Sequence, residues 1–137
     1  MKKAVLAAFA LVLVLSLAAC GGTKPTTPPE LTGEWKQTNS ASADAWQAAT
    51  IQGDTIEVYW VSDNGDTESL YWAGTFVAPT TPDEPYTWDS VNDKSKTDTA
   101  LLASPDDTKT FTYQNGVLSY KVSALGTTTT VKLEKQS

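Results

Sequence analysis

The sequence predicts an all-β fold, an antiparallel meander of about eight strands that closes into a small up-and-down barrel. Three observations predict it. From Leu31 onward the chain is rich in threonine, valine, tyrosine and tryptophan, which favour strands. Apolar and polar residues alternate in short segments separated by turn-forming pairs, and no window of about 11 residues has a helical period. A two-sheet β-sandwich is the alternative arrangement of the same strands.

The expected strands, in chain order, are residues 33–39, 45–52, 55–62, 67–78, 98–103, 108–114, 117–124 and 127–135. Residues 41–49 are rich in alanine, so a short helix is the alternative there. In 67–78, Leu70, Trp72, Gly74 and Phe76 are expected to share a face. The alternation is clearest in 55–62, where one face should carry Ile56, Val58 and Trp60 and the other Glu57, Tyr59 and Val61.

Close turns are expected between neighbouring strands. The pairs Gly53-Asp54, Asn64-Gly65 and Asn115-Gly116 are typical of tight hairpins, because glycine and asparagine adopt positive φ, and Gly126 is a weaker signal. One long loop, residues 79–96, interrupts the meander. Its three prolines disfavour a central strand in its first half and leave room for a short strand around 86–89. Closure into a barrel would remove the exposed sheet edges.

The amino end has the order of a secretory signal: Lys2 and Lys3, then an apolar run over residues 4–19, then Cys20. The run is shorter than the roughly 20 residues of a bilayer-spanning helix. Its last residues and the cysteine, Leu-Ala-Ala-Cys, resemble the lipobox of bacterial lipoproteins. The resemblance implies cleavage before Cys20, diacylglycerol on its sulfur and a further acyl chain such as palmitate on the new amine, which together anchor a protein stably. An ordinary signal peptide with a chance cysteine is the alternative.

We therefore expect a signal peptide over residues 1–19, a lipidated tether over 20–30 and a β-barrel domain over 31–137. The tether is made mainly of glycine, threonine and proline and can bury little apolar surface, so it should be solvated and partly extended. The lipoprotein resemblance implies an extracytoplasmic location, on the outer face of the plasma membrane or, in a Gram-negative cell, in the outer membrane. Gly21 stands where an aspartate can retain such proteins in the inner membrane.

Composition restricts the chemistry that the chain can perform. All ten basic residues are lysines, and there is no histidine. Without the two lysines of residues 1–19, 16 acidic residues stand against 8 lysines, and this net charge of −8 disfavours nucleic acid as a partner. The lack of histidine and, once Cys20 is lipidated, of any thiol excludes an intrachain disulfide, Cys or His metal sites and Ser-His or Cys-His nucleophiles. We expect no enzyme and no cofactor; the carboxylates Glu84, Asp89 and Asp93 are the clustered candidates for the remaining design, a glycosidase-type pair.

Gly33-Glu34-Trp35, at the start of the first expected strand, resembles the G-x-W motif of lipocalins and related calycins. In those families the tryptophan closes one end of the barrel, often under a basic side chain of the last strand. The resemblance therefore implies a lipocalin-like barrel with Trp35 at its closed end. Arginine is the usual basic partner, and Lys132 is the candidate here, through a cation–π contact. A tryptophan that anchors the core of any β fold is the alternative.

The second half of the long loop places aromatic and polar side chains together: Tyr86, Trp88, Asp89 and Asn92. Aromatic faces beside carboxylates and amides suit sugar binding or a hot spot for a protein partner. A lid whose aromatic residues cover one mouth of the barrel is the structural alternative.

Two further sets of residues are weaker candidates. Trp60 and Trp72, with Phe76 and Phe111, either line an apolar cavity or fill the interior of a small barrel. Oxygen ligands gather around the Asn64-Gly65 turn and suit either calcium or a solvated turn; these are Asp63, Asp66 and Glu68.

Together these observations favour a membrane-anchored cell-surface or periplasmic lipoprotein whose non-catalytic domain binds a protein partner of the cell envelope. The alternative function is lipocalin-like binding of a small apolar or sugar ligand. That alternative requires a cavity of at least a few hundred Å³.

Overall fold

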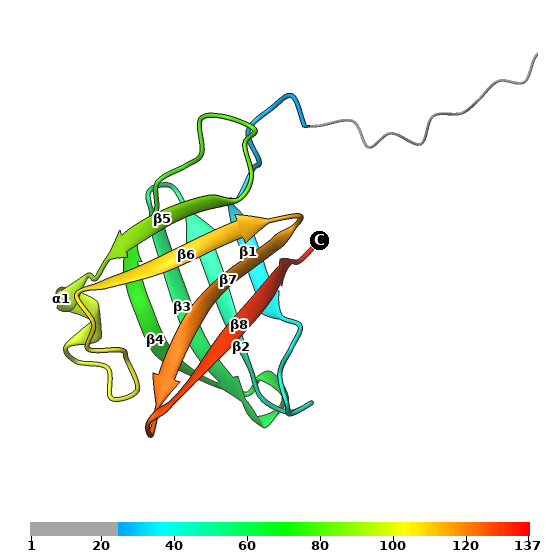
Figure 1. The fold of residues 1–137 in the computed structure, drawn as a ribbon. Helices are drawn as coiled ribbons and strands as arrows, with labels where there is room; N and C mark the ends of the chain where they lie inside the picture. Colours follow the sequence, from blue (N-terminus) through cyan, green and yellow to red (C-terminus); the bar gives the residue numbers. More distant parts are fainter. Residues whose placement is uncertain (1–24) are drawn as a thin grey trace, which may run out of the picture.

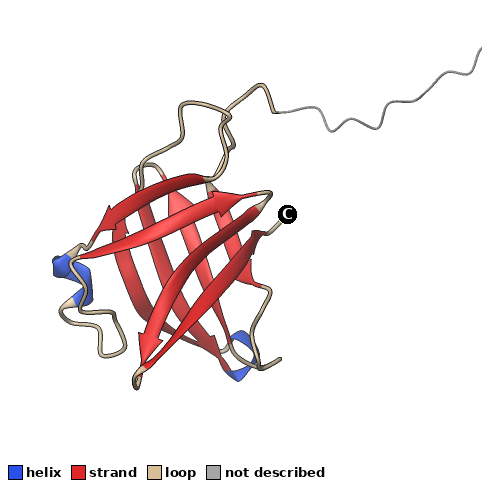
Figure 2. Ribbon diagram, in the orientation of Figure 1, coloured by secondary structure: helices blue, strands red, loops and turns tan. Residues whose placement is uncertain are grey.

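Eight strands follow one another around a barrel in the computed structural model, which describes residues 25–137 (Figure 1). A 3-10 turn at Asp63–Gly65 joins the third strand to the fourth, and a one-turn helix, α1 (Lys94–Thr97), follows the fifth (Figure 2). The strands are β1 (Gly33–Gln37), β2 (Trp46–Gln52), β3 (Thr55–Ser62), β4 (Thr67–Thr75), β5 (Tyr86–Val91), β6 (Thr108–Gln114), β7 (Val117–Ala124) and β8 (Thr127–Lys135).

The sheet order is β4-β3-β2-β1-β8-β7-β6-β5, with every pair antiparallel. Each strand therefore pairs with its neighbour in sequence, and β1 also pairs with β8. The two edge strands, β4 and β5, meet through a single bridge between Gly74 and Asn92, so the barrel is nearly closed. The predicted all-β, up-and-down barrel is confirmed.

Side chains complete the seam between β4 and β5. Trp72 Nε1 donates to Ser90 Oγ at 3.0 Å, and the Val91 backbone N–H donates to Thr75 Oγ1 at 2.9 Å. Gly74 lies where the strands are closest, since a Cβ placed there would come within 2.6 Å of the Val91 carbonyl oxygen. The seam is therefore held by one backbone bridge and by side-chain hydrogen bonds.

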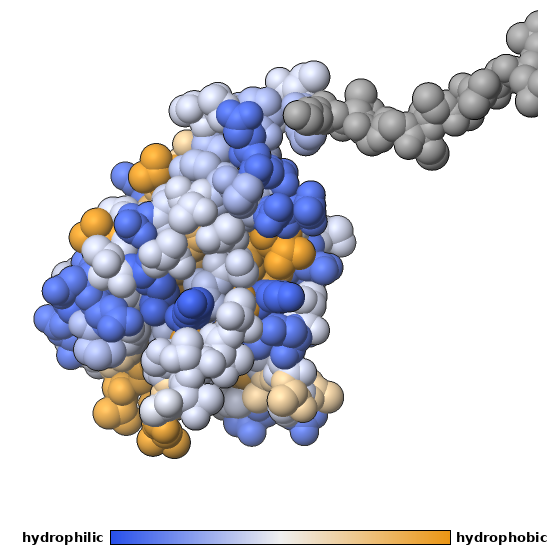
Figure 3. Space-filling model, viewed as in Figure 1, coloured by the Kyte–Doolittle hydropathy of each residue, from blue (hydrophilic) through white to orange (hydrophobic). Residues whose placement is uncertain are grey.

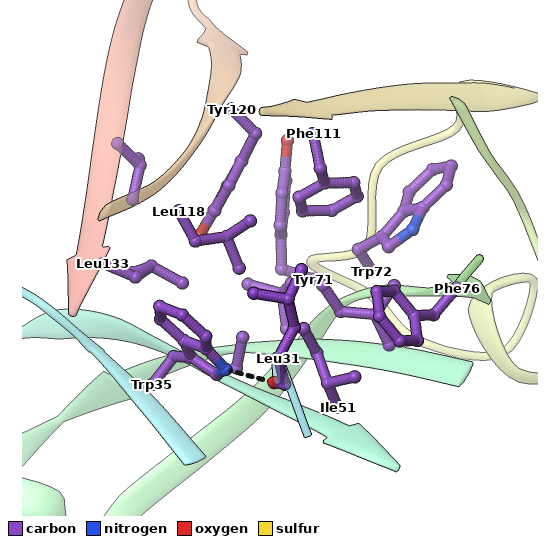
Figure 4. Close-up of a cluster of buried hydrophobic side chains, with 14 of the residues drawn as sticks. Leu31, Trp35, Ile51, Tyr71, Trp72, Phe76, Phe111, Leu118, Tyr120 and Leu133 are labelled. Carbon is purple, nitrogen blue, oxygen red and sulfur yellow. Dashed lines mark hydrogen bonds between the residues drawn. The ribbon is translucent and has the colours of Figure 1, made fainter. Parts of the chain in front are cut away.

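The interior of the barrel is filled by large apolar side chains (Figure 4). Trp35, Trp72 and Phe111 are each no more than 2% exposed. Aromatic rings pack on one another through the core, with the rings of Trp88 and Phe111 stacked at 5.2 Å between centroids. An eight-stranded barrel is just wide enough for its own side chains, and here they occupy it.

Around the long loop, one predicted strand is absent and another is longer than expected. No strand forms at residues 98–103, which are turns outside the barrel, and Leu101 there is 97% exposed. The strand that completes the barrel is β5, longer than the short one considered at 86–89. The physical reason is the pattern of buried residues, because Trp88 and Ser90 alternate inward on β5. After this strand, Asp93 caps α1 by accepting a hydrogen bond from the Ser95 N–H, and the chain leaves the barrel. The alternative helix at 41–49 does not form either.

The predicted faces of β3 and β4 hold only in part. Ile56 and Val58 are buried as expected, but the register shifts between Val58 and Tyr59. Val58 pairs with Trp72 and Tyr59 pairs with Leu70, so Tyr71 is an extra residue on β4. This bulge turns Tyr71 as well as Trp72 into the core and leaves Leu70 half-buried, so Leu70 does not share their face.

Trp35 packs at the end of the barrel where the described chain begins. It is 2% exposed, its Nε1 donates to the Leu31 carbonyl at 3.0 Å, and the ring of Tyr113 meets it edge-on at 6.2 Å. The predicted cation–π contact of Trp35 with Lys132 is wrong, because Lys132 alternates with the buried Val131 and Leu133 and is exposed. The lysine at this end is Lys135, which lies over Gly33 and donates to the Glu30 carbonyl at 2.9 Å.

Candidate functional site

One end of the barrel, which we call the mouth, is open. The β1–β2 loop (residues 38–45), the loop after α1 (residues 98–107) and the β7–β8 hairpin surround a pocket there of about 540 Å³, the mouth pocket. None of the residues that line it carries a charge. They are Gln37, Ser40, Ala41, Ser42, Ala45, Trp46, Gln47, Trp60, Val61, Ser62, Leu102, Val122, Ala124, Thr127, Thr129 and Val131.

Gln47 lies at the base of the mouth pocket. The buried positions of β2 are Gln47, Ala49 and Ile51, so strand alternation turns this amide inward with two apolar neighbours. The side chain is 1% exposed, and its Oε1 accepts a hydrogen bond from the Tyr120 hydroxyl. Among residues 25–137, its Nε2 has no hydrogen-bond partner. A buried donor without a partner costs roughly 1–3 kcal/mol, so the Nε2 group can still donate to an acceptor that residues 25–137 do not supply.

Tyr120, in the core of the barrel, holds the amide of Gln47 in place. Its ring is 3% exposed and packs between Tyr71, at 6.4 Å, and Phe111, at 5.1 Å. Burial, and secondarily the charge of Tyr71, raises the pKa of Tyr120 well above its usual value. The phenol therefore keeps its proton over the ordinary pH range and donates it to Gln47 Oε1.

Trp60 fixes the loop after α1 at the rim of the mouth. Its Nε1 donates to the Leu102 carbonyl at 3.3 Å, and its ring meets Tyr71 edge-on at 5.3 Å. The Ser104 N–H donates to the Tyr71 carbonyl at 2.8 Å. The loop therefore contributes Leu102 to the wall of the mouth pocket, although it belongs to no strand.

Three leucines project from the loop after α1 and from the β7–β8 hairpin. Leu101 is 97% exposed, Leu102 is 53% exposed and Leu125 is fully exposed. Apolar residues gather at the same end of the molecule in Figure 3, at the lower left. Leu125 also adopts φ 52°, in the left-handed region that a branched apolar residue rarely occupies. The mouth therefore has an apolar rim.

The aromatic residues predicted for the long loop lie on β5 and pack in or against the core of the barrel. Trp88 is 5% exposed and donates from Nε1 to the Thr75 carbonyl at 3.3 Å. Tyr86 stacks on Trp88 at 5.7 Å and donates its hydroxyl proton to the Val77 carbonyl. Trp72 is fully buried at the seam. Of the predicted aromatic residues, only Trp60 lines the mouth pocket.

The polar candidates of that region separate in the structure. Asp89 is exposed on the outside of β5 and accepts from Thr110 Oγ1 at 2.6 Å. Asn92 is 9% exposed, donates from Nδ2 to the Asp106 carbonyl at 2.7 Å and accepts from Thr97 Oγ1 at 2.6 Å. Asn92 thus braces the loop after α1 instead of presenting its amide to a ligand.

The carboxylates considered for hydrolysis do not converge. Glu84 accepts from the Asn115 backbone N–H at 2.6 Å, near the start of β5, whereas Asp93 caps α1 beyond the end of the same strand. Asp89 lies between them on the outer face of β5.

The acidic turn carries no converging ligand set. Asp63 accepts from Thr67 Oγ1 at 2.8 Å, and Asp66 and Glu68 are exposed nearby. Across residues 25–137, no three carboxylates lie close enough together to hold a metal ion.

A second, polar pocket of about 470 Å³ opens in the barrel wall between β6 and β7. These strands pair at only three positions, from Thr112 with Ser119 to Gln114 with Val117, and then diverge. Lys109, 7% exposed, occupies the gap, with its Nζ 3.4 Å from the Lys121 carbonyl oxygen. A side chain thus replaces the missing backbone pairing.

Sequence reasoning missed Gln47 and Leu125. A signal for Gln47 was present, because it stands in phase with Ala49 and Ile51 and so had to point inward on β2. The signal for Leu125 was weaker, since Leu-Gly is an unusual pair for a hairpin turn.

The lipidation candidate, Cys20, and the rest of the expected signal peptide lie outside the described residues. Within residues 25–137, no helix is long and apolar enough to cross a membrane.

The fold and this site define a class of protein: a small antiparallel β-barrel with a filled interior and one open, uncharged mouth. Comparison of the chain with protein-family models, with curated proteins and with solved structures found no match.

Proposed function

We propose that this chain is a lipid-anchored, non-catalytic binding protein of the cell envelope that holds a small, mostly apolar ligand in the mouth pocket. The observation that carries the proposal is the pocket itself. Its volume of about 540 Å³ is in the usual range of small-molecule sites, roughly 300–1,000 Å³. Its wall combines apolar side chains with one buried amide, which is the usual composition of such a site. Because side chains fill the interior, the ligand sits at the mouth.

A fluorescent apolar probe tests the binding function. N-phenyl-1-naphthylamine brightens in apolar surroundings, and we expect it to bind the purified protein saturably. Ala45→Phe places a large side chain in the mouth pocket and should abolish saturable binding. Ala48→Phe is the matched control, because Ala48 lies three residues further along the chain, on β2, but lines no part of this pocket. Failure of the wild type to bind, or equal binding by both variants, would contradict the proposal.

The anchoring part of the proposal rests on the order of charge, apolar run and Leu-Ala-Ala-Cys at the amino end. We expect Cys20→Ala to move the protein from the membrane fraction to the medium or periplasm, because the acylated sulfur is lost. Ser16→Ala, within the apolar run, is the control and should leave the protein in the membrane fraction. Membrane association of the Cys20→Ala protein equal to that of the wild type would refute lipid anchoring.

A second candidate function is docking of an envelope protein on the apolar rim. The specific observation is the exposure of Leu101 and Leu125 beside the mouth. A photo-crosslinker at either position should then trap one partner in cells. The same group at Val77, which is also exposed but lies in the loop at the other end of β4, should not. Identical products from all three positions would refute this function.

A further inference from the structure

We propose that the ligand of the mouth pocket is a neutral molecule with a carbonyl oxygen on an apolar body, and that Gln47 Nε2 donates a hydrogen bond to this oxygen. The inference rests on the proposed function and adds the chemical class of the ligand. Three features carry it: the unpartnered N–H of Gln47, its fixed orientation and the absence of charge in the pocket wall.

The orientation of the Gln47 amide follows from its partner. Tyr120 is buried, and its hydroxyl donates to the Oε1 of Gln47, which leaves the NH₂ group free. With the amide turned over, its NH₂ would face the hydroxyl, and the Tyr120 proton would lose its acceptor while Oε1 became unpartnered. The observed arrangement leaves one polar group without a partner, whereas the reversed one leaves two. Gln47 lines the mouth pocket, and the free group of its amide is therefore a donor, whose complement is an acceptor.

The position of Gln47 determines how a ligand would be oriented in the mouth pocket. Beyond it along β2, Ala49 and Ile51 belong to the packed core, at 2% and 1% exposed. On the other side, Trp60 and Leu102 line the pocket and are partly exposed at the rim. A ligand with its acceptor at one end would place that end on Gln47 and its apolar body between the walls.

The wall of the mouth pocket favours a neutral acceptor over a carboxylate. The lining contains no lysine. Lys36 lies over the ring of Trp46, a lining residue, at 3.9 Å from its centroid, but Lys36 itself does not line the pocket. A carboxylate at Gln47 would lose its hydration without gaining a counter-charge, which is costly, whereas a ketone, amide or ester carbonyl would lose little.

Matched probes test the inference. 2-Acetylnaphthalene and 2-ethylnaphthalene have nearly the same shape, and the first carries a carbonyl where the second has a methylene group. Their dissociation constants are measured with the wild-type protein, with Gln47→Met and with Gln52→Met. Met keeps the length of Gln and removes the donor, and Gln52 is an exposed residue at the other end of β2. Comparing the ratio of the two constants between proteins cancels the difference in hydrophobicity between the probes.

We expect the preference for the ketone to be roughly threefold to tenfold greater in the wild type than in Gln47→Met, as for a neutral hydrogen bond. Gln52→Met should retain the wild-type ratio. A ratio that is the same in all three proteins, with both probes bound, would overturn the carbonyl inference and leave the proposed function intact. If neither probe bound the wild type, the proposed function would fail and the inference with it.

Two further measurements use the wild type alone, in case Gln47→Met does not fold. The side-chain amide NMR signal of Gln47 should shift with 2-acetylnaphthalene and stay in place with 2-ethylnaphthalene; equal shifts would overturn the inference. 2-Naphthoate should bind more weakly than the ketone, and tighter binding of this carboxylate would overturn the assignment of a neutral ligand.

Discussion

Two hairpin turns of the barrel have the same backbone conformation but different residues. Asn115-Gly116 has φ values of 51° and 82°, and Leu125-Gly126 has 52° and 78°. Both are the positive-φ pair of a type I′ turn, in which asparagine is favoured and leucine is not. Leu125 is fully exposed, so no packing compensates for its conformation. The strain and exposure of Leu125 fit the docking function proposed above for the apolar rim.

Exchanging the residues of these two turns tests whether the backbone of Leu125 is strained. Leu125→Asn should raise the free energy of unfolding by about 1 kcal/mol, because asparagine tolerates the left-handed conformation. Asn115→Leu should lower it by a similar amount, since the Asn115 contact to Glu84 uses its backbone N–H and survives the change. Urea unfolding measures both. A loss of stability in Leu125→Asn would show that this leucine makes a stabilising contact.

At the scale of elements, the barrel depends on the seam between β4 and β5. Elsewhere neighbouring strands share ladders, as with eight paired positions between β7 and β8, but here a single bridge joins Gly74 to Asn92. Trp72 reaches across to Ser90, and the Asp93 N–H donates to the Ala73 carbonyl at 2.8 Å. These contacts require a close approach of the strands, which glycine at position 74 permits.

Gly74→Ala should therefore lower the free energy of unfolding by about 2–3 kcal/mol, because the new methyl group meets backbone as well as side-chain atoms. Gly116→Ala is the matched control. It has φ 82° but no atom within 4 Å of an added Cβ, so it should cost only about 1 kcal/mol of conformational strain. Denaturant unfolding compares the two. Equal losses would show that Gly74 has no packing role beyond that of an ordinary strand residue.

At the scale of the whole molecule, an ion pair links the two halves of the barrel across the seam. Lys96, in α1 after β5, donates to Glu57 on β3, and the Tyr59 hydroxyl donates to the same carboxylate at 2.7 Å. The hydrogen bond from Lys96, followed by that from Tyr59, lowers the pKa of Glu57. Burial, and secondarily the hydrogen bond to Glu57, raises the pKa of Tyr59 to about 12.

The sign of the pH effect follows from the lowered pKa of Glu57. The unfolded chain binds a proton near pH 4.5, whereas the folded chain binds it only at lower pH. The stabilisation is therefore present above about pH 4.5 and lost as the pH falls through the folded pKa. Glu57→Gln should thus be less stable than the wild type at pH 6, with a smaller difference at pH 3, as measured by urea midpoints. Glu34→Gln, at an exposed position of β1, is the control. An equal difference at both pH values for Glu57→Gln would contradict this account.

Much of the barrel could be predicted from local patterns. The observed β3, β6, β7 and β8 have the expected bounds, because alternation and turn residues are local properties of the chain. The wrong strand prediction arose because two segments, residues 86–91 and 98–103, could each have supplied the strand that pairs with β6. Residues 98–103 contain an apolar leucine pair, and residues 86–91 contain aromatic residues after three prolines. Only packing against β6, where Trp88 meets Phe111, decides between them.

The candidate site was less predictable, for a physical reason. Sequence alone determined a β-rich chain without histidine or arginine, an apolar amino end that closes on Cys20, and the inward phase of Gln47 on β2. Tertiary structure decided that Tyr120, 73 residues away in sequence, takes one end of the Gln47 amide and leaves the other unpartnered. It also decided that Trp72 and Trp88 fill the interior while Trp60 remains at the mouth. Whether an inward residue is packed, paired or left for a ligand depends on which distant strands meet it, and alternation within one strand carries no information about that.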